Sequence, residues 1–428
     1  MFDRPNIGER AILVHVNFTR GKDEADLEEL RELALTAGAE IVAQVEASRP
    51  SPDAKLFVGL GKAEEIGELI KLHEANLIIF NHTLSPGQER NLEKLFECRV
   101  LSRTGLILDI FAQRAHTFEG KLQVELAQLQ YNSTRLVRGW THLESQKGGI
   151  GMRGPGETQL ELDKRLLKNR LKMIKSRLEK VRAQRALGRQ ARKRSLIPTI
   201  SIVGYTNAGK STLFNRLTGS DVYAANQLFA TLDPTLRQVI VPHLGKVIFA
   251  DTVGFIRNLP HDLVQAFRAT LEETIEADLL LHVIDASNPD RDLYQAQVEL
   301  VLEEIGATEH PCLKVMNKID LMPDVEPKID VDESGKPCEI WLSAYANQGM
   351  DLLHNAIAQL LMHSTLQGVI TLKPSHGKLR AALYQQKCVF DESTDEEGNT
   401  ELTIKIPKAD LEDLCRKEGV ILDEIFKP

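Results

Sequence analysis

The pattern of apolar and polar residues divides the first 115 residues into short strands and helices. Apolar runs that indicate buried strands lie at 11–18, 40–46, 55–58 and 77–80. Segments that indicate helices lie at 23–37, 62–74 and 85–97. Because strands that alternate with helices form parallel sheets, residues 1–115 are predicted to be an N-terminal parallel α/β domain. VGLGK at 58–62 is interpreted as a turn, since a GxG fragment alone is weak evidence for a nucleotide site.

A long helical hairpin is predicted to follow, over residues 116–196. The pattern over 103–140 is mostly helical, and Ser133 completes a heptad seam with leucines at Leu122, Leu126, Leu129 and Leu136. A similar spacing continues further along at Leu160, Leu167, Leu171, Ile174, Leu178 and Val181. Thr158 and Glu161 form a capping box, which indicates a helix start just past Gly156. Two such helices joined by one loop favour an antiparallel pair with loop 141–156 at its tip.

The second helix of this hairpin is strongly basic. Residues 164–194 contain fourteen Lys or Arg and a single acid, Glu179, which gives a local charge of +13. Since the whole chain carries −8, the other 397 residues must carry −21. A solvated helix face would gain from acid–base pairs four residues apart. The scarcity of acids therefore favours contact with a polyanion such as nucleic acid.

The clearest chemical motif is GYTNAGKS at 204–211, which follows the strand-like run TISIV at 199–203. It matches the phosphate-loop pattern G-x-x-x-x-G-K-[ST]. Gly204 and Gly209 let the backbone wrap the phosphates, Lys210 places an ammonium on the β and γ phosphates, and Ser211 offers a hydroxyl to Mg²⁺. The motif predicts a P-loop domain over residues 197–364.

Two further motifs specify guanine as the base. NKID at 317–320 follows the strand-like run CLKVM, and a carboxylate at Asp320 can accept both the N1–H and the 2-amino group of guanine. Adenine lacks that pair of donors, so it would leave the carboxylate unpaired. Asn317 is expected to bond the other edge of the purine, and Ser343 and Ala344 to support guanine O6.

The switch segments lie between these motifs. In DTVG at 251–254, Asp251 is expected to hold Mg²⁺ through water, and the Gly254 N–H to contact the γ phosphate. In FATLDPT at 229–235, Thr231 is the predicted switch threonine that closes on Mg²⁺, with Thr235 as the rival. The residues predicted to contact the nucleotide are Gly204, Tyr205, Thr206, Asn207, Ala208, Gly209, Lys210, Ser211, Phe229, Ala230, Thr231, Leu232, Asp233, Asp251, Thr252, Val253, Gly254, Asn317, Lys318, Ile319, Asp320, Ser343 and Ala344.

The predicted catalytic residues lack one group that small GTPases have. Lys210, Gly254 and Thr231 are the predicted catalytic residues, but Phe255 follows DTVG where small GTPases carry a glutamine that orients water. Slow intrinsic hydrolysis, accelerated by a partner, is therefore expected. Asn207 stands where related potassium-dependent GTPases carry asparagine, so a K⁺ ion is a hypothetical substitute for the missing charge.

The rest of the chain predicts a small α/β C-terminal domain over 365–428. It contains an acidic loop at 391–401, a strand at 402–406 and a helix near 408–417. The five cysteines lack CxxC spacing, which indicates reduced cytosolic thiols rather than zinc ligands. No apolar run approaches eighteen residues and MFDRPNIGER has no signal-peptide core, so no membrane span or secretory signal is expected.

At this level of detail the sequence resembles the HflX family of ribosome-associated GTPases, in its bacterial, proteobacterial-type form. The resemblance covers essentially the whole chain and rests on KGGIGMRGPGETQLELDKR at 147–165, the nucleotide motifs above, and DTVGFIRNLPHDLV. It implies a GTPase that binds the 50S subunit and rRNA, splits stalled or idle 70S ribosomes under stress such as heat, and is stimulated by ribosomes. The nucleotide motifs themselves indicate GTP or GDP with Mg²⁺. A monomer in solution and a cytoplasmic location, partly peripheral to membranes through ribosomes, are also expected.

The glycine-rich loop is then interpreted as an RNA-binding tip rather than a second phosphate site, since a helix and not a strand precedes it. Glycines would let a thin backbone enter an RNA cavity, where Lys147 and Arg153 meet phosphates. The predicted RNA-binding residues are Lys147, Gly149, Arg153, Gly154, Pro155, Gly156, Lys164, Arg165, Lys168 and Arg170. Three alternatives stay open: a loop that is merely a flexible connection, ATP-dependent RNA remodelling through the N-terminal domain, and a GTPase whose hairpin docks on a partner protein.

Overall fold

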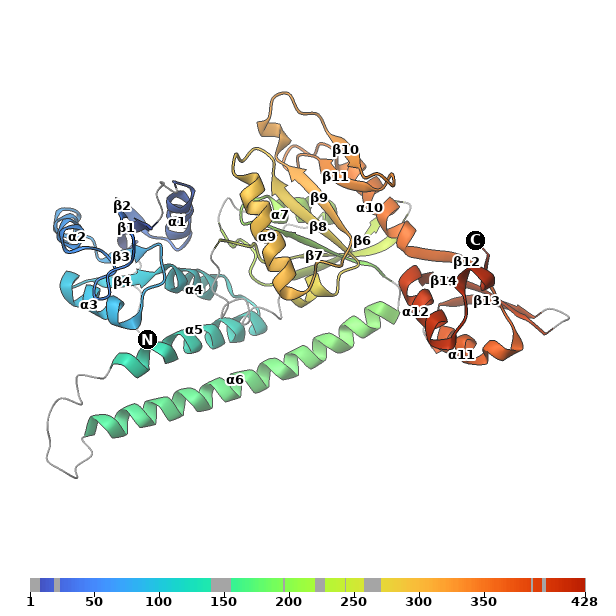
Figure 1. The fold of residues 1–428 in the computed structure, drawn as a ribbon, viewed down its shortest axis with the longest axis horizontal. Coiled ribbons are helices and arrows are strands. Elements are labelled where there is room, and N and C mark those ends of the chain that lie inside the picture. The colour runs from blue at the N-terminus through green and yellow to red at the C-terminus, as the bar shows by residue number, and fades with distance from the viewer. Residues whose placement is uncertain are drawn as a thin grey trace. The chain divides into compact units, whose positions relative to one another are not determined.

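The computed structural model describes residues 8–18, 24–139, 155–194, 197–219, 228–242, 244–257, 271–385, 388–394 and 398–427. The chain divides into two compact units. Unit 1 comprises Met1–Val181, Ala225–Asp233 and Ile256–Ala269, and unit 2 comprises Arg182–Ala224, Pro234–Phe255 and Thr270–Pro428. Figure 1 shows the three sheets and the helices around them, which confirm the predicted α/β class.

The first sheet, in unit 1, has four parallel strands in the order β2-β1-β3-β4. The strands are β1 (Arg10–Asn17), β2 (Glu40–Ser48), β3 (Leu77–Phe80) and β4 (Arg99–Ser102). The helices between and after them are α1 (Glu24–Thr36), α2 (Leu60–His73), α3 (Pro86–Phe96) and α4 (Arg103–Arg114). Ile12, Val14 and Val16 on alternate positions of β1 join the core with residues of α2 and α3, as the strand period of two requires. The predicted parallel α/β fold is confirmed, and β4 is an additional strand.

One predicted strand is wrong. Residues 51–59 form turns instead of a strand at 55–58, with only an isolated bridge between Asp53 and Phe57. The carboxylate of Asp53 accepts hydrogen bonds from the Lys55 and Leu56 N–H groups, at 2.8 Å each, and these bonds compete with a ladder. Phe57 has a φ of 67°, which no regular strand allows.

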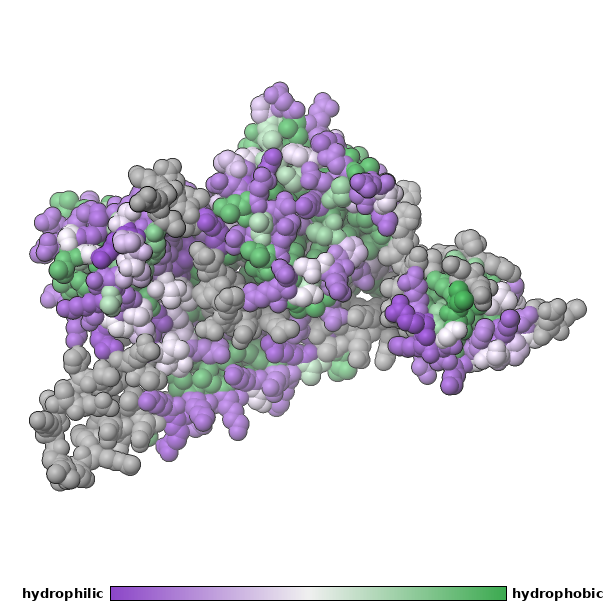
Figure 2. All heavy atoms as spheres, in the orientation of Figure 1, coloured by the Kyte–Doolittle hydropathy of each residue, from purple (hydrophilic) through white to green (hydrophobic). Residues whose placement is uncertain are grey.

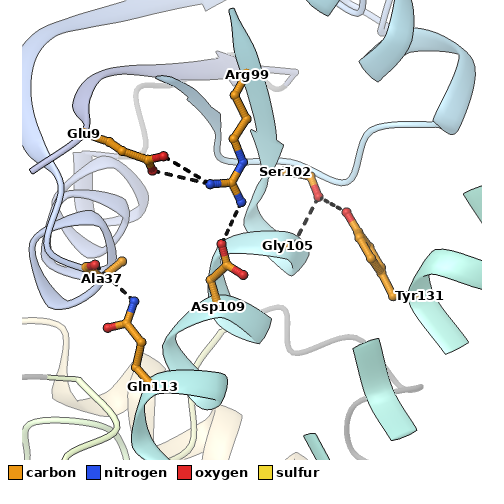
Figure 3. A network of polar contacts seen from close by, with 8 residues as sticks. All are labelled: Glu9, Ala37, Arg99, Ser102, Gly105, Asp109, Gln113 and Tyr131. Carbon is orange, nitrogen blue, oxygen red and sulfur yellow. Dashed lines mark hydrogen bonds and ion pairs between the residues drawn. The ribbon is translucent and has the colours of Figure 1, made fainter. Parts of the chain in front are cut away.

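Helix α5 (Phe118–Gly139) is fastened to this sheet by side chains. The Tyr131 hydroxyl lies 2.7 Å from Ser102 Oγ, which also accepts the Gly105 N–H at the start of α4. Figure 3 shows this pair beside a second cluster, in which Arg99 contacts Glu9 and Asp109. Each of these contacts joins an end of β4 to a helix, so α4 and α5 are both attached to this strand.

The predicted seam between α5 and α6 (Pro155–Arg194) is confirmed where side chains are described. Leu122, Leu126, Ile174 and Leu178 form one apolar cluster, with Leu129 and Leu171 packed against it. The two helices run antiparallel (Figure 1). Accordingly, apolar residues near the start of α5 share a cluster with residues far along α6. Arg170 pairs with Glu125 at 2.5 Å beside the seam.

The predicted start of α6 needs correction. The helix begins at Pro155, so Gly156 and Thr158 lie inside it rather than before it. Two start signals compete within four residues here. Proline at the first helical position loses no hydrogen bond and has a φ already suited to a helix, so it can open the helix earlier.

The second sheet, in unit 2, has seven strands in the order β10-β11-β9-β8-β5-β7-β6. Its strands are β5 (Thr199–Gly204), β6 (Thr235–Val241), β7 (Gly245–Asp251), β8 (Leu279–Asp285), β9 (Cys312–Asn317), β10 (Lys328–Val331) and β11 (Pro337–Trp341). Its helices are α7 (Lys210–Thr218), α9 (Arg291–Ile305), η1 (Ile319–Leu321) and α10 (Met350–Ser364). The five central strands are parallel, so their carboxyl ends meet at one edge.

The third sheet, near the C-terminus, has four antiparallel strands in the order β13-β14-β12-β15. Its strands are β12 (Thr365–Leu372), β13 (Val389–Thr394), β14 (Thr400–Pro407) and β15 (Phe426–Lys427). Its helices are η2 (Pro374–His376), α11 (Gly377–Gln385), α12 (Lys408–Glu418) and α13 (Leu422–Ile425). The predicted acidic loop at 391–401 is partly wrong, because both of its ends belong to paired strands.

Among the described residues, no helix combines the length and hydropathy that crossing a membrane requires.

Candidate nucleotide site

The phosphate-loop residues connect β5 to α7 at the carboxyl edge of the central sheet. Gly204 and Gly209 both have positive φ, +149° and +95°. A Cβ at Gly204 would lie 2.3 Å from the Val283 carbonyl oxygen, and one at Gly209 would lie 2.2 Å from Asn317 Nδ2. Both glycines of the motif are therefore required by backbone conformation and by close approach, as the sequence predicts.

Lys210 is buried at the start of α7. Its Nζ donates a hydrogen bond to the Tyr205 carbonyl oxygen at 2.6 Å, which holds the side chain along the loop. Burial lowers the pKa of Lys210 to about 8, while the carboxylate of Asp251 opposes that shift and Lys318 adds to it. An anionic phosphate beside Nζ would favour the charged form, which suits the predicted role of this ammonium.

The two groups predicted to serve Mg²⁺ from unit 2 are in contact. Ser211 Oγ donates to Asp251 Oδ2 at 2.9 Å, and Asp251 is buried at the end of β7. Hydroxyl and carboxylate oxygens are the hard ligands that Mg²⁺ prefers. The donor set therefore fits this metal, which Ser211 would hold directly and Asp251 through water.

The DTVG segment is joined to the phosphate loop by its backbone. Tyr205 and Phe255 form a parallel bridge, in which the Thr206 N–H donates to Phe255 O at 2.8 Å and the Phe255 N–H donates to Gly204 O at 3.1 Å. The ring of Phe255 is 3% exposed, so this position offers an apolar side chain packed in the core. An ideal Cβ on Gly254 would lie 3.0 Å from Lys210 Nζ, which places the Gly254 backbone against the phosphate-loop ammonium.

Asn317 links the NKID motif to the phosphate loop. Its Nδ2 donates to the Ala208 carbonyl oxygen at 2.9 Å, and its Oδ1 accepts the Ala344 N–H at 3.0 Å. Ser343 Oγ donates to Asp320 Oδ1 and accepts the Ala346 N–H. Asp320 is exposed, and its carboxylate is oriented by that hydroxyl. Three segments from different strands thus meet around one asparagine.

Three residues of this site were not predicted. Asp285, at the end of β8, pairs with Lys318 Nζ at 2.7 Å and so holds the lysine of NKID. Arg216 donates to the carbonyl oxygens of Ala344 and Tyr345, at 3.0 Å each, and supports their loop. Tyr294 stacks on Tyr205 with ring centroids 4.3 Å apart. An acid at the carboxyl end of a buried strand was a usable signal for Asp285, whereas nothing in the local pattern marks the other two.

The predicted nucleotide residues fall into two groups. Residues 204–211, 251–254, 317–320 and 343–344 belong to unit 2 and follow β5, β7, β9 and β11 at one edge. Residues 229–233 belong to unit 1, where Thr231 is buried. The rival Thr235 belongs to unit 2, at the start of β6, and pairs with Asp251 in the ladder.

The predicted RNA-binding residues lie partly outside the described residues. Lys147, Gly149, Arg153 and Gly154 are outside them, and Pro155 and Gly156 open α6. The other four predicted residues are exposed on α6: Lys164, Arg165, Lys168 and Arg170. Figure 2 shows hydrophilic atoms along the outer side of this helix and apolar atoms beside α5.

Three family models match the chain. "GTP-binding GTPase N-terminal" matches residues 24–112, "GTP-binding GTPase Middle Region" matches 114–192, and "50S ribosome-binding GTPase" matches 199–318. Among curated proteins, the chain is 56% identical over 426 residues to "GTPase HflX" of Escherichia coli (strain K12), covering 100% of both chains. The chain belongs to the HflX family of GTPases. GTP hydrolysis is accordingly its activity.

Further HflX relatives span most or all of the chain. The protein from Caldanaerobacter subterraneus subsp. tengcongensis is 47% identical over 392 residues, covering 91% of this chain and 89% of the relative. The HflX protein of Magnetococcus marinus is 42% identical over 435 residues and covers 100% of both. The family resemblance inferred from the motifs is thus confirmed by comparison over the full length.

Solved structures were also matched at lower similarity. A GTP-binding protein from the archaeon Sulfolobus solfataricus in complex with GDP is 26% identical, with a TM-score of 0.44, covering 83% of this chain and 99% of that chain. A structure titled as the SsGBP and GDP complex is also 26% identical, with a TM-score of 0.48 and the same coverage.

Proposed function

We propose that this HflX-family GTPase binds the large ribosomal subunit and splits stalled or idle 70S ribosomes under stress such as heat. Ribosomes stimulate its hydrolysis of GTP. It works in the cytoplasm as a monomer, and it reaches membranes only through ribosomes at their surface.

The exposed basic face of α6 carries this proposal. Lys164, Arg165 and Lys168 are exposed, and residues 164–194 hold a single acid to offset fourteen positive charges. A face with this charge excess binds polyanions, and RNA is the polyanion of the ribosome. The helix follows directly on the glycine-rich segment 141–154, so both would meet the same RNA surface. The match of residues 199–318 to "50S ribosome-binding GTPase" supports the large subunit as the target.

The chemistry proposed for the nucleotide site uses GTP and Mg²⁺. Ser211 and Thr231 would hold the metal directly and Asp251 through water, and the metal would supply positive charge to the β and γ phosphates. Lys210 and the Gly254 N–H stabilise charge on the transferred phosphoryl group. GTP then orders the segments around Thr231 and Gly254, and hydrolysis releases the protein from the ribosome.

Slow intrinsic hydrolysis follows from Phe255, whose buried ring cannot orient a water molecule. We expect Asn207, in a left-handed conformation with a φ of 62°, to contribute a ligand to K⁺. Comparison of turnover in K⁺ and Na⁺ buffers of equal ionic strength tests this point. Equal rates in both buffers would exclude the K⁺ role.

Sucrose-gradient profiles test ribosome splitting. Intact 70S particles are incubated with the protein and a non-hydrolysable GTP analogue, and free 30S and 50S subunits are expected. If subunits appear only with ATP, the alternative of ATP-dependent RNA remodelling is favoured. If no nucleotide releases subunits, splitting is excluded.

Salt dependence and tip variants separate RNA binding from protein docking. Binding to 50S subunits should weaken steeply with salt, because phosphate contacts release counterions. Replacing Arg153 together with Gly154, Pro155 and Gly156 should abolish ribosome action while leaving GTP affinity intact. Collapse of GTP affinity in that variant would mean that the loop is a nucleotide site after all.

A further inference from the structure

The segment before β6 belongs structurally to unit 1, although its sequence lies between nucleotide motifs. Residues 228–233 are described there, and they contain Thr231, the proposed switch threonine. Leu228 and Leu232 are buried, and the Leu228 N–H donates to Thr36 Oγ1 at the end of α1 at 3.3 Å. The segment is therefore held by specific contacts in unit 1.

Asp233 makes the most specific of these contacts, at the start of α5. Its Oδ2 accepts the N–H groups of His116 and Thr117, at 2.9 and 2.8 Å. Its Oδ1 accepts the Thr117 hydroxyl at 2.5 Å, and that hydroxyl oxygen accepts the Gly120 N–H at 2.9 Å. Thr117 is the residue that caps the start of α5 through its own hydroxyl. Asp233, 116 residues away in sequence, adds a second cap by accepting the Thr117 N–H.

Phe229 provides a second hold on the same segment. Its ring packs edge-on against Phe111 of α4, with centroids 4.7 Å apart, and both rings are buried. Phe229 has a φ of 54°, a left-handed conformation that is unfavourable for an aromatic residue. Such a conformation persists only where surrounding packing determines it. Unit 1 therefore fixes the backbone on both sides of Thr231.

Helix α5 is the first helix of the hairpin and is held by contacts with the first sheet and with α6. Tyr131 bonds Ser102, and Arg135 Nε donates to Glu89 of α3 at 2.9 Å. The Arg135 guanidinium also lies 3.4 Å from the centre of the Tyr131 ring. The apolar cluster of Leu122, Leu126, Ile174 and Leu178 joins α5 to the basic helix α6. Continuous contacts therefore connect α6, through α5, to the segment that Asp233 holds.

We propose that the Asp233 carboxylate is a nucleotide-sensitive cap on α5, a positioning residue that couples Thr231 to the helical hairpin. Only Leu232 separates Asp233 from Thr231, and only Pro234 separates it from β6 of the nucleotide sheet. When GTP draws Thr231 to Mg²⁺, Asp233 moves with it and leaves the N–H groups of His116 and Thr117. Movement of α5 by a bound ribosome acts on Thr231 through the same contact. The ribosomal part of this coupling rests on the proposed function, whereas the cap itself does not.

Hydrogen exchange tests the cap without ribosomes. In the full-length protein, amides of His116 and Thr117 should exchange about fivefold faster with a GTP analogue than with GDP, as loss of one cap implies. In Asp233→Ala, both nucleotide states should show the fast rate. Equal exchange in the two nucleotide states of the parent protein would overturn the proposal.

Two further variants address the contact from each side. An ideal Cβ on Gly120 lies 2.1 Å from Asp233 Oδ1, so Gly120→Ala should displace the carboxylate and behave as Asp233→Ala does. Gly67→Ala in α2 is the matched control, because nothing lies within 4 Å of that Cβ. Asp233→Asn keeps an oxygen for the two N–H groups and an amide to donate to Thr117, so it should retain nucleotide-dependent exchange.

Kinetics with 50S subunits test the coupling to the hairpin. The ratio of kcat with 50S to kcat without it should fall about fivefold to tenfold in Asp233→Ala and Gly120→Ala. Gly120→Ala, which lies outside the predicted nucleotide residues, should leave GDP affinity and 50S binding unchanged. An unchanged ratio in both variants would refute the coupling. If 50S fails to stimulate the parent protein, the proposed function fails, while the exchange experiment still decides the cap.

Discussion

Replacing Gly254 with alanine tests how closely the DTVG segment must approach the phosphate loop. The added Cβ would lie 2.8 Å from Thr206 Cγ2 and 3.1 Å from Thr206 Cα, against 3.4–4 Å for ordinary contact. Thr206 cannot retreat freely, because its N–H is bonded to the Phe255 carbonyl oxygen at 2.8 Å. Gly254 must therefore move away by about 0.6 Å, the difference between 2.8 and 3.4 Å.

That displacement should remove the Gly254 N–H from the γ phosphate. Loss of one aligned donor to a developing charge costs about 100-fold to 1000-fold in kcat, or roughly 3–4 kcal/mol. Affinity for GDP should stay within about threefold, since GDP has no γ phosphate for this donor and the loss falls on the transition state.

Multiple-turnover hydrolysis of GTP with and without 50S subunits gives kcat, and titration of a fluorescent GDP gives the affinity. Gly377→Ala is the control in the same unit, because its Cβ meets nothing within 4 Å and its φ of −57° suits alanine. Hydrolysis by Gly254→Ala within threefold of the parent rate would refute the argument. Equal loss of GDP affinity would show instead that the whole loop had moved.

Three other substitutions have directions set by the structure. Asp320→Asn should weaken GTP binding by on the order of 100-fold and favour xanthosine nucleotides, which nucleotide competition would measure. Arg103→Met should cost about 3–5 kcal/mol in urea unfolding, because it removes the guanidinium that pairs with the buried Glu29 carboxylate, and adding Glu29→Gln should recover part of that loss. Burial lowers the pKa of His282 to about 4, so the unfolded chain binds the extra proton between pH 6.5 and 4, and stability falls as pH drops through that window. The parent protein should therefore lose up to about 3 kcal/mol more unfolding free energy than His282→Gln between pH 6.5 and 4, as thermal melts would measure. Identical pH dependence of stability in the two proteins would contradict this.

Local patterns predicted the elements whose signals are local. The strand at 77–80 and the strand–loop–helix around GYTNAGKS follow from apolar runs and from residue types that the phosphate loop requires. The error at 55–58 arose because the Asp53 side chain bonds the backbone in place of a strand partner. A four-residue apolar run cannot reveal that competition.

Contacts between segments far apart in the chain could not be predicted from the sequence. Asp233 was predicted from its motif as a nucleotide residue, yet its carboxylate caps a helix 116 residues earlier. Arg216 supports the loop at Ala344 from 128 residues away, and no periodicity connects the two. Spacing rules describe one element at a time, so partners brought together only by the fold remain invisible to them.

The apolar seam between α5 and α6 also limits how the lengths of these two helices can change. At 1.5 Å per residue, the 40 residues of α6 extend about 60 Å. Inserting seven residues into each helix would preserve the apolar face and lengthen the helix pair by about 10 Å. Inserting five would rotate everything beyond the insertion by about 140° and turn leucines toward water. The paired helices can therefore be lengthened without losing their apolar seam only by insertions close to whole helical turns, such as seven or eleven residues.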